Sequence, residues 1–254
     1  MAAGHRDASG NPGAGVVAAA RRTDSRKSSA PQGLTKGEAR AGAGGVSTSG
    51  RRAGASGAPV RCALLAYEMN GQPLFPQHGA PLRLVMPGWY GMTNVKWLSH
   101  ITVTTEPFAG YQHERAYRLR ATTDEAGTPM SRIEAHALMV PPGIPDFLTR
   151  QRVVRAGRCV LTGRAWSGWG AITAVEVSVD GGETWADAQL DEPKLGPWAW
   201  HGWSYQWDAD VPGEYVLGCR ARDATGRAQA DRLGWTDGGY ANPAPQRVRV
   251  TVGR

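Results

Sequence analysis

Hydrophobic and polar residues alternate with a period of two along most of the chain after residue 61, which is the pattern of half-buried β-strands. In the C-terminal run, Val248, Val250 and Val252 fall on one face of such a strand. Short alternating strands separated by Gly/Pro turns over roughly 100 residues predict an immunoglobulin-like β-sandwich, so the fold class is mainly β. The runs that predict strands cover residues 82–86, 96–103, 159–166, 172–179, 214–223 and 246–252.

Turn-rich segments divide this pattern into parts. Residues 121–131 are polar, and 141–145 contain three prolines and a glycine, so both interrupt the alternation. Asp180-Gly181-Gly182 supplies residues that tolerate positive φ and predicts a tight hairpin turn. We expect a tail over 1–60, a first folded region over 61–125 and a sandwich over 130–254.

The composition of the first 60 residues sets them apart. They contain no Phe, Trp or Tyr, and 33 of the 60 are Gly, Ala or Ser. Such a segment cannot bury enough apolar surface to offset the entropy of ordering, which predicts a disordered tail. Nine of the 29 Lys/Arg and three of the 22 Asp/Glu lie there, so the tail carries +6 of the net +7. Because these charges are scattered rather than gathered on a folded face, we expect no nucleic-acid partner.

From the sequence as written, we expect neither an export signal nor a membrane anchor. Its most apolar N-terminal run, residues 16–20, is shorter than the core of a secretory signal, and Arg21 follows the run instead of preceding it. No stretch is long or apolar enough to span a bilayer. The expectation is a chain without a membrane partner, cytoplasmic by default.

Three cysteines, Cys62, Cys159 and Cys219, are too few and too scattered for a disulfide framework or a zinc cluster. Cys159 and Cys219 both fall in strand-like runs, so a bridge across the sheets and two buried free thiols are both compatible with the sequence. Free thiols are favoured, because an isolated cysteine is commonly a small core residue.

The segment MPGWYGMTNVKWLSHI, residues 86–101, is a glycine-rich loop between two predicted strands. A strand, a tight loop and a second strand can bring backbone N–H groups close to an anion. His78, Arg83 and Lys96 flank this loop, and an arginine offers a two-pronged donor to phosphate. Spacing alone equally fits a Pro-Gly turn with solvated cations.

Longer motifs favour the first interpretation, because together they resemble the sulfite oxidase family of molybdenum enzymes over residues 63–252. The family has a mixed α/β molybdopterin-binding domain followed by an immunoglobulin-like dimerisation domain. The motifs in the first region are LLAYEMNGQPL at 64–74, His78-Gly79-x-Pro81-x-Arg83, and Pro87-Gly88-x-x-Gly91-x-x-x-Val95-Lys96-Trp97-Leu98. Those in the second region are AWSG at 165–168, VEVS-x-DGG-x-x-W at 175–185, Trp198-x-Trp200 and Trp235.

The resemblance implies a molybdopterin-type molybdenum cofactor and a site for it. In the family, the His-x-x-x-x-Arg pair and the Val-Lys of the loop hold the phosphate and the pyranopterin. A tyrosine about twenty residues later lies beside the metal's oxo ligand and the substrate anion. The matching residues are His78, Arg83, Thr93, Asn94 and Lys96 for the cofactor and Tyr117 for catalysis. The implied partners are a small oxyanion such as sulfite, an electron acceptor such as a c-type cytochrome, and a second copy of the chain.

Two departures from the family pattern limit these expectations. The family's metal-ligating cysteine lies well upstream of the LLAYEMNGQPL motif, whereas Cys62 stands immediately before it and is not expected to be the ligand. After Trp235 this chain has Asp237 where animal members carry Asn and a substrate-binding Arg nearby, and a carboxylate there would repel an anion. The first region therefore resembles a truncated piece of the cofactor domain. On this basis, the chain alone is expected to bind molybdopterin weakly or not at all and not to oxidise sulfite.

Two further interpretations compete with an enzyme. One is a non-catalytic, self-associating sandwich module. The other is a sugar-binding sandwich whose aromatic platform would consist of Trp198, Trp200, Trp203 and Trp207. Core and dimer packing is the favoured role for these tryptophans, since aromatic side chains dominate both kinds of contact.

Overall fold

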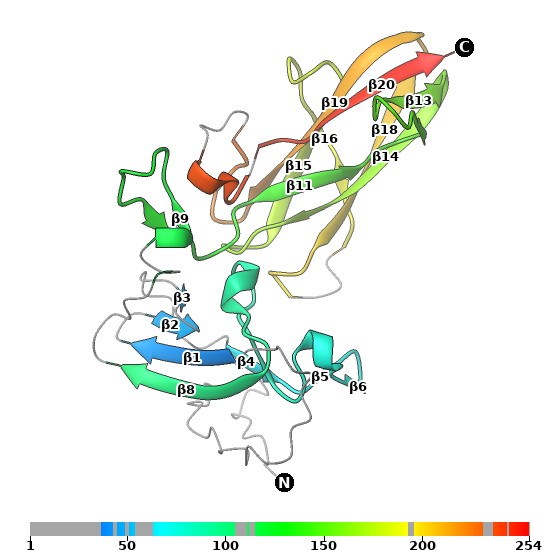
Figure 1. Cartoon of the computed structure of the whole chain (residues 1–254). Helices are drawn as coiled ribbons and strands as arrows, with labels where there is room; N and C mark the ends of the chain where they lie inside the picture. Colours follow the sequence, from blue (N-terminus) through cyan, green and yellow to red (C-terminus); the bar gives the residue numbers. More distant parts are fainter. Residues whose placement is uncertain are drawn as a thin grey trace. The chain divides into compact units, whose positions relative to one another are not determined.

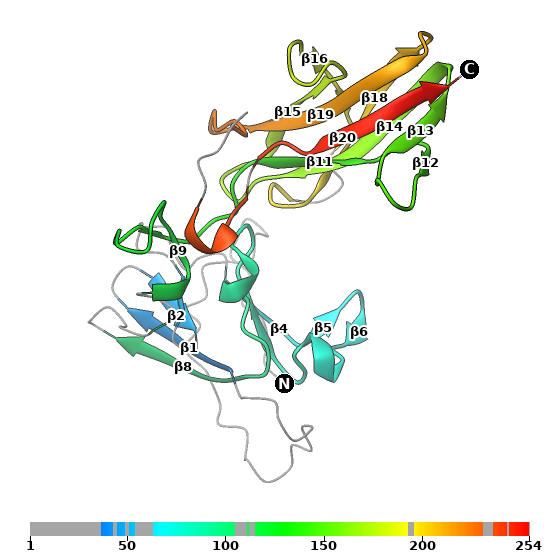
Figure 2. The same ribbon diagram turned by 45° about the horizontal axis from the view of Figure 1, so that its top comes forward.

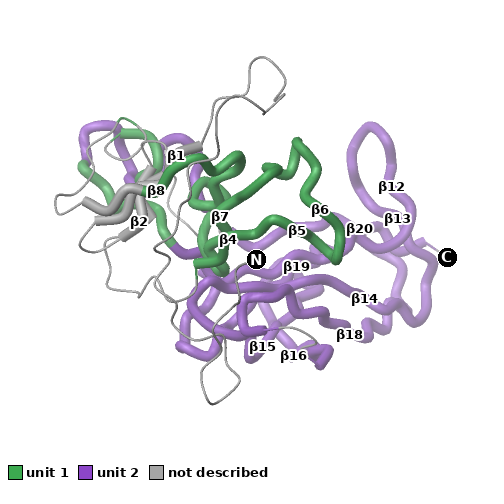
Figure 3. Tube along the Cα trace, turned by 90° about the horizontal axis from the view of Figure 1, so that it is seen from below, with its two compact units in different colours: residues 1–118, 126–131 green, residues 119–125, 132–254 purple. Residues whose placement is uncertain are grey.

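The computed structural model describes residues 37–42, 45–48, 51–53, 63–104, 111, 115–192, 196–230, 236–242 and 244–253. The chain divides into two compact units, which are coloured separately in Figure 3. Unit 1 comprises residues 1–118 and 126–131, and unit 2 comprises residues 119–125 and 132–254. Each unit is described by itself below.

Unit 2 is built from two β-sheets that face each other (Figures 1 and 2). The first sheet has four strands, in the order β11-β14-β18-β17. Their bounds are His136–Val140 (β11), Gly157–Trp166 (β14), His201–Ala209 (β18) and Gln189–Leu190 (β17). All neighbours in this sheet are antiparallel.

The second sheet has six strands, in the order β12-β13-β20-β19-β15-β16. Only β13 and β20 pair in parallel. The bounds are Ile144–Pro145 (β12), Arg152–Arg155 (β13), Arg247–Gly253 (β20), Gly213–Asp223 (β19), Ile172–Ser178 (β15) and Ala186–Asp187 (β16).

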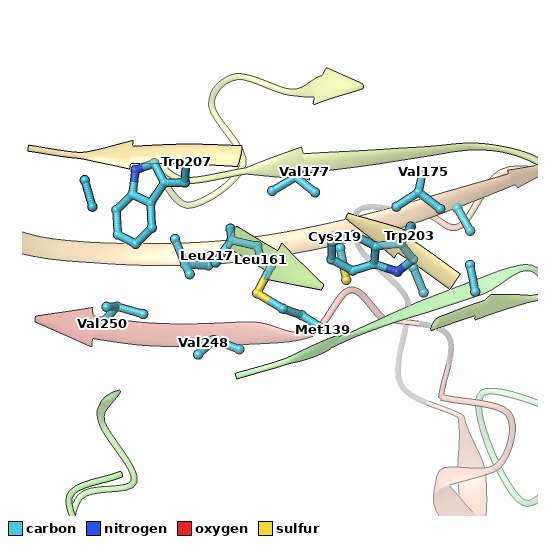
Figure 4. Close-up of a cluster of buried hydrophobic side chains, with 14 of the residues drawn as sticks. Met139, Leu161, Val175, Val177, Trp203, Trp207, Leu217, Cys219, Val248 and Val250 are labelled. Carbon is cyan, nitrogen blue, oxygen red and sulfur yellow. The ribbon is translucent and has the colours of Figure 1, made fainter. Parts of the chain in front are cut away.

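The core of unit 2 lies between the two sheets (Figure 4). Trp203 of β18 and Leu161 of β14 enter it from one sheet, and Leu217 of β19 enters it from the other. Val248, Val250 and Val252 are buried on one face of β20, as the alternation predicts, because successive side chains of a strand point to opposite sides. The predicted mainly β fold with a C-terminal sandwich is confirmed.

The turn around Asp180 differs from the predicted tight hairpin. Gly181 and Gly182 do adopt positive φ values of 82° and 99°. The chain returns only at β16, however, so a loop of residues 179–185 joins the two strands. The Asp180 carboxylate accepts hydrogen bonds from the backbone N–H groups of Glu183 and Thr184, at 3.0 and 2.9 Å. This side chain organises a wider loop than two glycines alone would require.

Unit 1 consists of short strands and single turns. A four-stranded sheet has the order β3-β2-β1-β8, and two two-stranded antiparallel sheets, β4-β7 and β5-β6, accompany it. The bounds are Gly37–Gly42 (β1), Gly45–Thr48 (β2), Arg51–Ala53 (β3), Leu64–Ala66 (β4), Glu68–Met69 (β5), Gln72–Pro73 (β6), Pro76–His78 (η2), Arg83–Val85 (β7), Gly91–Thr93 (η3) and Leu98–Thr104 (β8). A further pair, Arg118–Leu119 (β9) and Thr128–Pro129 (β10), lies at the unit boundary.

Strands β1, β2 and β3 fall inside residues 1–60, where the composition predicts disorder. β1 pairs in parallel with β8, from Gly37 opposite Leu98 to Gly42 opposite Thr104. Backbone hydrogen bonds form a sheet without aromatic side chains, and this is the contribution that a composition argument omits. The rest of the predicted tail lies outside the described residues.

Cys159 and Cys219 are free thiols. Cys219 is fully buried in the sandwich core, and burial raises its pKa to about 12. Cys62 lies outside the described residues. The described part of the chain contains no helix that is long and apolar enough to cross a membrane.

Candidate functional site

A single turn in unit 1 brings together three of the five predicted cofactor residues, His78, Arg83 and Lys96. The 3-10 helix η2, Pro76–His78, ends at Gly79, which has a φ of 107°. A left-handed residue of this kind closes a helical turn: the Gly79 N–H donates to the Pro76 carbonyl at 3.0 Å, and the carbonyl groups that follow are left for donors outside the turn. The turn therefore offers the carbonyl oxygens of residues 76–79 as hydrogen-bond acceptors.

Two of the predicted cations donate to this turn. Arg83 Nη1 donates to the His78 carbonyl at 3.0 Å. Lys96 Nζ donates to the Gln77 carbonyl at 2.7 Å. The structure thus brings Arg83 and Lys96, which are 13 residues apart in the sequence, to neighbouring carbonyl groups of one turn. The His78 ring lies 6.3 Å from the ring of Phe75.

Close packing fixes the lysine against the turn. A Cβ atom placed on Gly79 would lie 2.9 Å from Lys96 Cβ. Real Cβ contacts are essentially never that short, so only glycine allows this approach. The glycine in the His-Gly motif is therefore explained by the path of the Lys96 side chain.

One hydrogen-bond donor of Arg83 is unpaired among the described residues. Its Nε atom is buried and has no hydrogen-bond partner within the described part of the chain. Burying a guanidinium N–H without an acceptor is costly, so such an atom marks a place where an acceptor belongs. A phosphate oxygen suits it, because arginine binds phosphate through parallel N–H donors. The residues present thus fit the phosphate-bearing end of the cofactor that the sequence implies.

Thr93 and Asn94 hold the glycine-rich loop together. The Thr93 side chain is completely buried, and its hydroxyl donates to the Tyr90 carbonyl at 2.8 Å. Asn94 Oδ1 accepts a hydrogen bond from the Met86 backbone N–H at 2.7 Å. Both side chains are therefore used inside the loop. Any contact that these residues make with a cofactor stays a prediction.

Tyr117, the predicted catalytic residue, is half-buried and precedes β9. Its carbonyl accepts a hydrogen bond from the Met130 N–H at 3.0 Å, which anchors the backbone of this segment within unit 1. The catalytic role of Tyr117 stays a prediction.

The carboxylate of Asp237 is paired. Arg120 Nε lies 2.9 Å from Asp237 Oδ2, and the two side chains are only 16% and 29% exposed. The Asp237 N–H also donates to the Arg120 carbonyl at 2.7 Å. An opposite charge at this distance offsets the negative charge of Asp237. The sequence predicted that an unpaired Asp237 carboxylate would repel an anion. Because Arg120 compensates its charge, that argument against an anionic substrate no longer applies.

The described residues contain no group of three or more His, Cys, Asp or Glu side chains arranged to hold a metal ion. Cys219 belongs to the sandwich core, and Cys159 packs against it. Burial raises the pKa of both thiols, which disfavours the thiolate that a metal requires. A thiolate ligand, if supplied by this chain, lies outside the described residues, as Cys62 does.

The four tryptophans considered as a sugar platform do not share one surface. Trp203 and Trp207 are buried in the sandwich core. Trp200 is 66% exposed and stacks on Trp166, with ring centroids 4.8 Å apart. Because the group divides between core and surface, the packing interpretation holds for Trp203 and Trp207.

Two residues that contact residues described above, one in each unit, are absent from the predicted site residues. Trp97 Nε1 donates to the Pro76 carbonyl at 2.7 Å, so this side chain also reaches the turn. Trp97 belongs to the Val-Lys-Trp-Leu motif, but the strand pattern does not indicate that its side chain contacts the preceding turn. The only sequence signal for Arg120 is that it follows Tyr117 by three residues. Its hydrogen-bond partner, Asp237, lies 117 residues away in the chain.

Comparison with known proteins agrees with this architecture. The family profile described as "Oxidoreductase molybdopterin binding domain" matches residues 9–112. The profile described as "Mo-co oxidoreductase dimerisation domain" matches residues 131–253. The first match begins inside the predicted tail and extends the resemblance toward the N-terminus. The two profiles together place the chain in the class of proteins with the domains of molybdopterin oxidoreductases.

Similarity to individual proteins identifies the family to which the chain belongs. The mitochondrial sulfite oxidase of Mus musculus is 36% identical over 201 residues, which cover 74% of this chain and 36% of that protein. The NADH nitrate reductase 1 of Oryza sativa subsp. japonica is 33% identical over 215 residues, covering 77% and 24%. The crystal structure of the sulfane dehydrogenase SoxCD from Paracoccus pantotrophus matches with a TM-score of 0.64 at 28% identity, covering 76% of this chain and 51% of that one. The chain belongs to the sulfite oxidase family. It spans about a third of the length of that sulfite oxidase and about a quarter of that nitrate reductase.

Proposed function

We propose that this chain supplies the phosphate-binding part of a molybdopterin site in an oxidoreductase acting on a small oxyanion such as sulfite. The observation that carries the proposal is the buried, unpartnered Arg83 Nε beside a turn that also receives Lys96. Two cations held at neighbouring carbonyl groups provide a concentrated positive charge for an anionic group.

The side chains of the site have separate tasks in this proposal. Arg83 donates its Nε–H to a phosphate oxygen while Nη1 stays on the His78 carbonyl. Lys96 uses one N–H on the Gln77 carbonyl and has two further donors for the same anion. His78 adds a ring nitrogen at the same turn. Tyr117 donates or accepts a proton at its phenolic oxygen beside the substrate.

When bound, the molybdenum cofactor supplies the two-electron redox step of oxygen-atom transfer. The described residues offer it cations but no thiolate. We therefore propose that the described residues bind the organic part of the cofactor more readily than they retain molybdenum. An electron acceptor such as a c-type cytochrome completes the proposed reaction.

The test is to produce the full chain in a host that synthesises the cofactor, and to measure pterin and molybdenum separately. Pterin fluorescence after oxidation should be detectable, and Arg83→Gln should lower it several-fold. Molybdenum should be well below one atom per chain, with no sulfite-dependent dye reduction. Arg158→Gln is the matched control, because this arginine is 71% exposed and lies in unit 2.

Two results would contradict the proposal. Equal pterin content in the wild type and in Arg83→Gln would remove the phosphate site. Near-stoichiometric molybdenum would show that the chain does supply a metal ligand. If Cys62→Ser then abolished that molybdenum, Cys62 would be the ligand.

We also propose that unit 2 forms a homodimer, as the description of its family profile suggests. The hairpin between β12 and β13 exposes Phe147 and Leu148 almost completely. Apolar side chains presented on a protruding hairpin favour burial against a second molecule. A Phe147→Ser/Leu148→Ser double variant should shift the molar mass in light scattering from dimer to monomer. Val211→Ser removes an exposed apolar residue elsewhere in unit 2 and should not.

A further inference from the structure

Trp97 adopts a backbone conformation that is rare for its residue type. Its φ is 51°, in the left-handed region, whereas an ordinary strand residue has a negative φ. A bulky side chain at positive φ is an outlier that persists only where surrounding contacts enforce it. Trp97 stands directly between Lys96 and β8, so the unusual conformation lies at the base of the proposed cofactor site.

The contacts that enforce it are visible on the η2 turn. The Trp97 N–H donates to the Gly79 carbonyl at 3.2 Å, and Nε1 donates to the Pro76 carbonyl at 2.7 Å. With the bonds from Lys96 and Arg83, each of the four carbonyl groups from Pro76 to Gly79 accepts one hydrogen bond from a residue outside the turn, and the Pro76 carbonyl also accepts one from the Gly79 N–H at 3.0 Å. Two of the four donors from outside the turn belong to Trp97.

The left-handed residue explains how adjacent side chains reach the same turn. In an extended strand, the side chains of residues 96 and 97 would point to opposite faces. Here Lys96 Nζ and Trp97 Nε1 bind the neighbouring carbonyl groups of Gln77 and Pro76. Lys96 Nζ also lies 5.5 Å from the centre of the Trp97 ring, within the range of a cation–π contact.

We propose that Trp97 is a positioning residue for the cofactor's phosphate: its left-handed backbone and its indole N–H hold Lys96 against the turn that also binds Arg83. The inference rests on the proposed function. Without the indole bond to Pro76, only the backbone bond to the Gly79 carbonyl holds residue 97 in the left-handed region, so Lys96 is held less firmly against the turn.

The variants separate the indole donor from the rest of the side chain. Trp97→Phe keeps an aromatic ring but removes the N–H, whereas Trp97→His keeps a ring N–H and is tolerated at positive φ. Pterin content per chain and the Kd for inorganic phosphate, measured by calorimetry on the full chain, are the two readouts. Trp97→Phe should weaken both several-fold, and Trp97→His should restore part of the loss.

A double variant shows whether Trp97 acts through Lys96. If it does, Trp97→Phe/Lys96→Gln should bind pterin and phosphate no more weakly than Lys96→Gln alone, because the two residues serve one interaction. Losses that multiply would overturn the inference, as would wild-type binding by Trp97→Phe. A Trp97→Phe chain that fails to fold is recognised by its thermal transition, and Trp97→His against Lys96→Gln then decides.

The outcomes distinguish this inference from the proposed function. If Arg83→Gln loses binding and Trp97→Phe does not, the phosphate site stands and the positioning role falls. If the wild type binds neither pterin nor inorganic phosphate, the proposed function falls and the inference falls with it.

Discussion

The two units hold their structure in different ways. Among its described residues, unit 2 has a core of 17 buried residues drawn from both sheets, and Leu161, Leu217 and Val250 are among those that are fully buried. Among the residues of unit 1 whose burial is described, the hydrophobic cluster has four buried members, Leu84, Met86, Val95 and Leu98. The turn of the proposed site in unit 1 is held instead by side-chain hydrogen bonds to backbone carbonyl groups.

This difference separates stability from function. Apolar burial contributes about 25 cal/mol per Å², so the large sandwich core dominates the stability of unit 2. Each neutral hydrogen bond contributes about 1 kcal/mol net and each one from a charged side chain about 1.5–3 kcal/mol, so a turn held by two of each kind is precise without being very stable. Binding sites commonly occupy such loops on a more stable support. Four predictions test this comparison, from the largest expected effect to the smallest.

The largest effect is expected from a cavity in the larger core. Leu161→Ala should lower the free energy of unfolding of unit 2 by about 2–5 kcal/mol, because a fully buried leucine leaves both lost contacts and a void. Leu84→Ala in the smaller cluster should fall at the low end of that range. Urea denaturation measures both. A greater loss for Leu84→Ala would reverse the comparison.

Removing a buried carboxylate from unit 2 should cost somewhat less. Asp223 accepts hydrogen bonds from Ser167 Oγ at 2.7 Å and from the Thr225 N–H at 2.9 Å. Burial raises the pKa of Asp223, but the hydrogen bonds of Thr225 and Ser167 outweigh it and the net pKa is lowered. Asp223→Ala should destabilise unit 2 by about 1–3 kcal/mol, because buried donors lose their acceptor. Thr173→Ala, at an exposed position in β15, is the control.

A smaller, pH-dependent effect is expected from His136. Burial lowers its pKa, and its Nδ1 lies 3.0 Å from Gln229 Nε2. Gln229 Oε1 already accepts from the Ala137 N–H, so Nε2 is the donor and Nδ1 the acceptor. A protonated Nδ1 cannot accept.

The folded-state pKa is below the unfolded value, so the unfolded chain binds more protons between the two. Stability is then complete above about pH 6.5 and decreases as the pH falls through that value. Thermal unfolding from pH 7.5 to 5.5 should show this decrease in the wild type. His136→Asn keeps an acceptor near the Nδ1 position and should flatten the profile; an unchanged slope would exclude His136 as its source.

The smallest effect is expected at the surface of unit 2. Arg158 Nε and Asp208 Oδ1 lie 3.7 Å apart, but the two side chains are 71% and 62% exposed. An exposed ion pair contributes about 0–1 kcal/mol. Asp208→Asn should therefore leave the urea midpoint nearly unchanged. A change as large as that of Asp223→Ala would mean that surface charge, rather than the core, supports the sandwich.

Much of the site could be predicted from local motifs. The His-Gly-x-Pro-x-Arg and Val-Lys-Trp-Leu segments identify Arg83 and Lys96, and the structure brings these two residues to one turn. The tasks of Thr93 and Asn94 could not be predicted, since their acceptor and donor depend on how the loop closes. The pairing of Asp237 with Arg120 was equally hidden, because 117 residues separate them.

The sequence by itself determined the strand pattern of unit 2, the buried face of β20 and the family, because a period of two and ordered motifs are local properties of the chain. Only the tertiary structure decided which charges are compensated and which remain available. Asp237 is neutralised by a distant arginine, whereas Arg83 Nε is buried without a partner. It also decided that Trp97 turns back to the carbonyl of Pro76, since a left-handed residue is imposed by contacts that its neighbours in sequence do not encode.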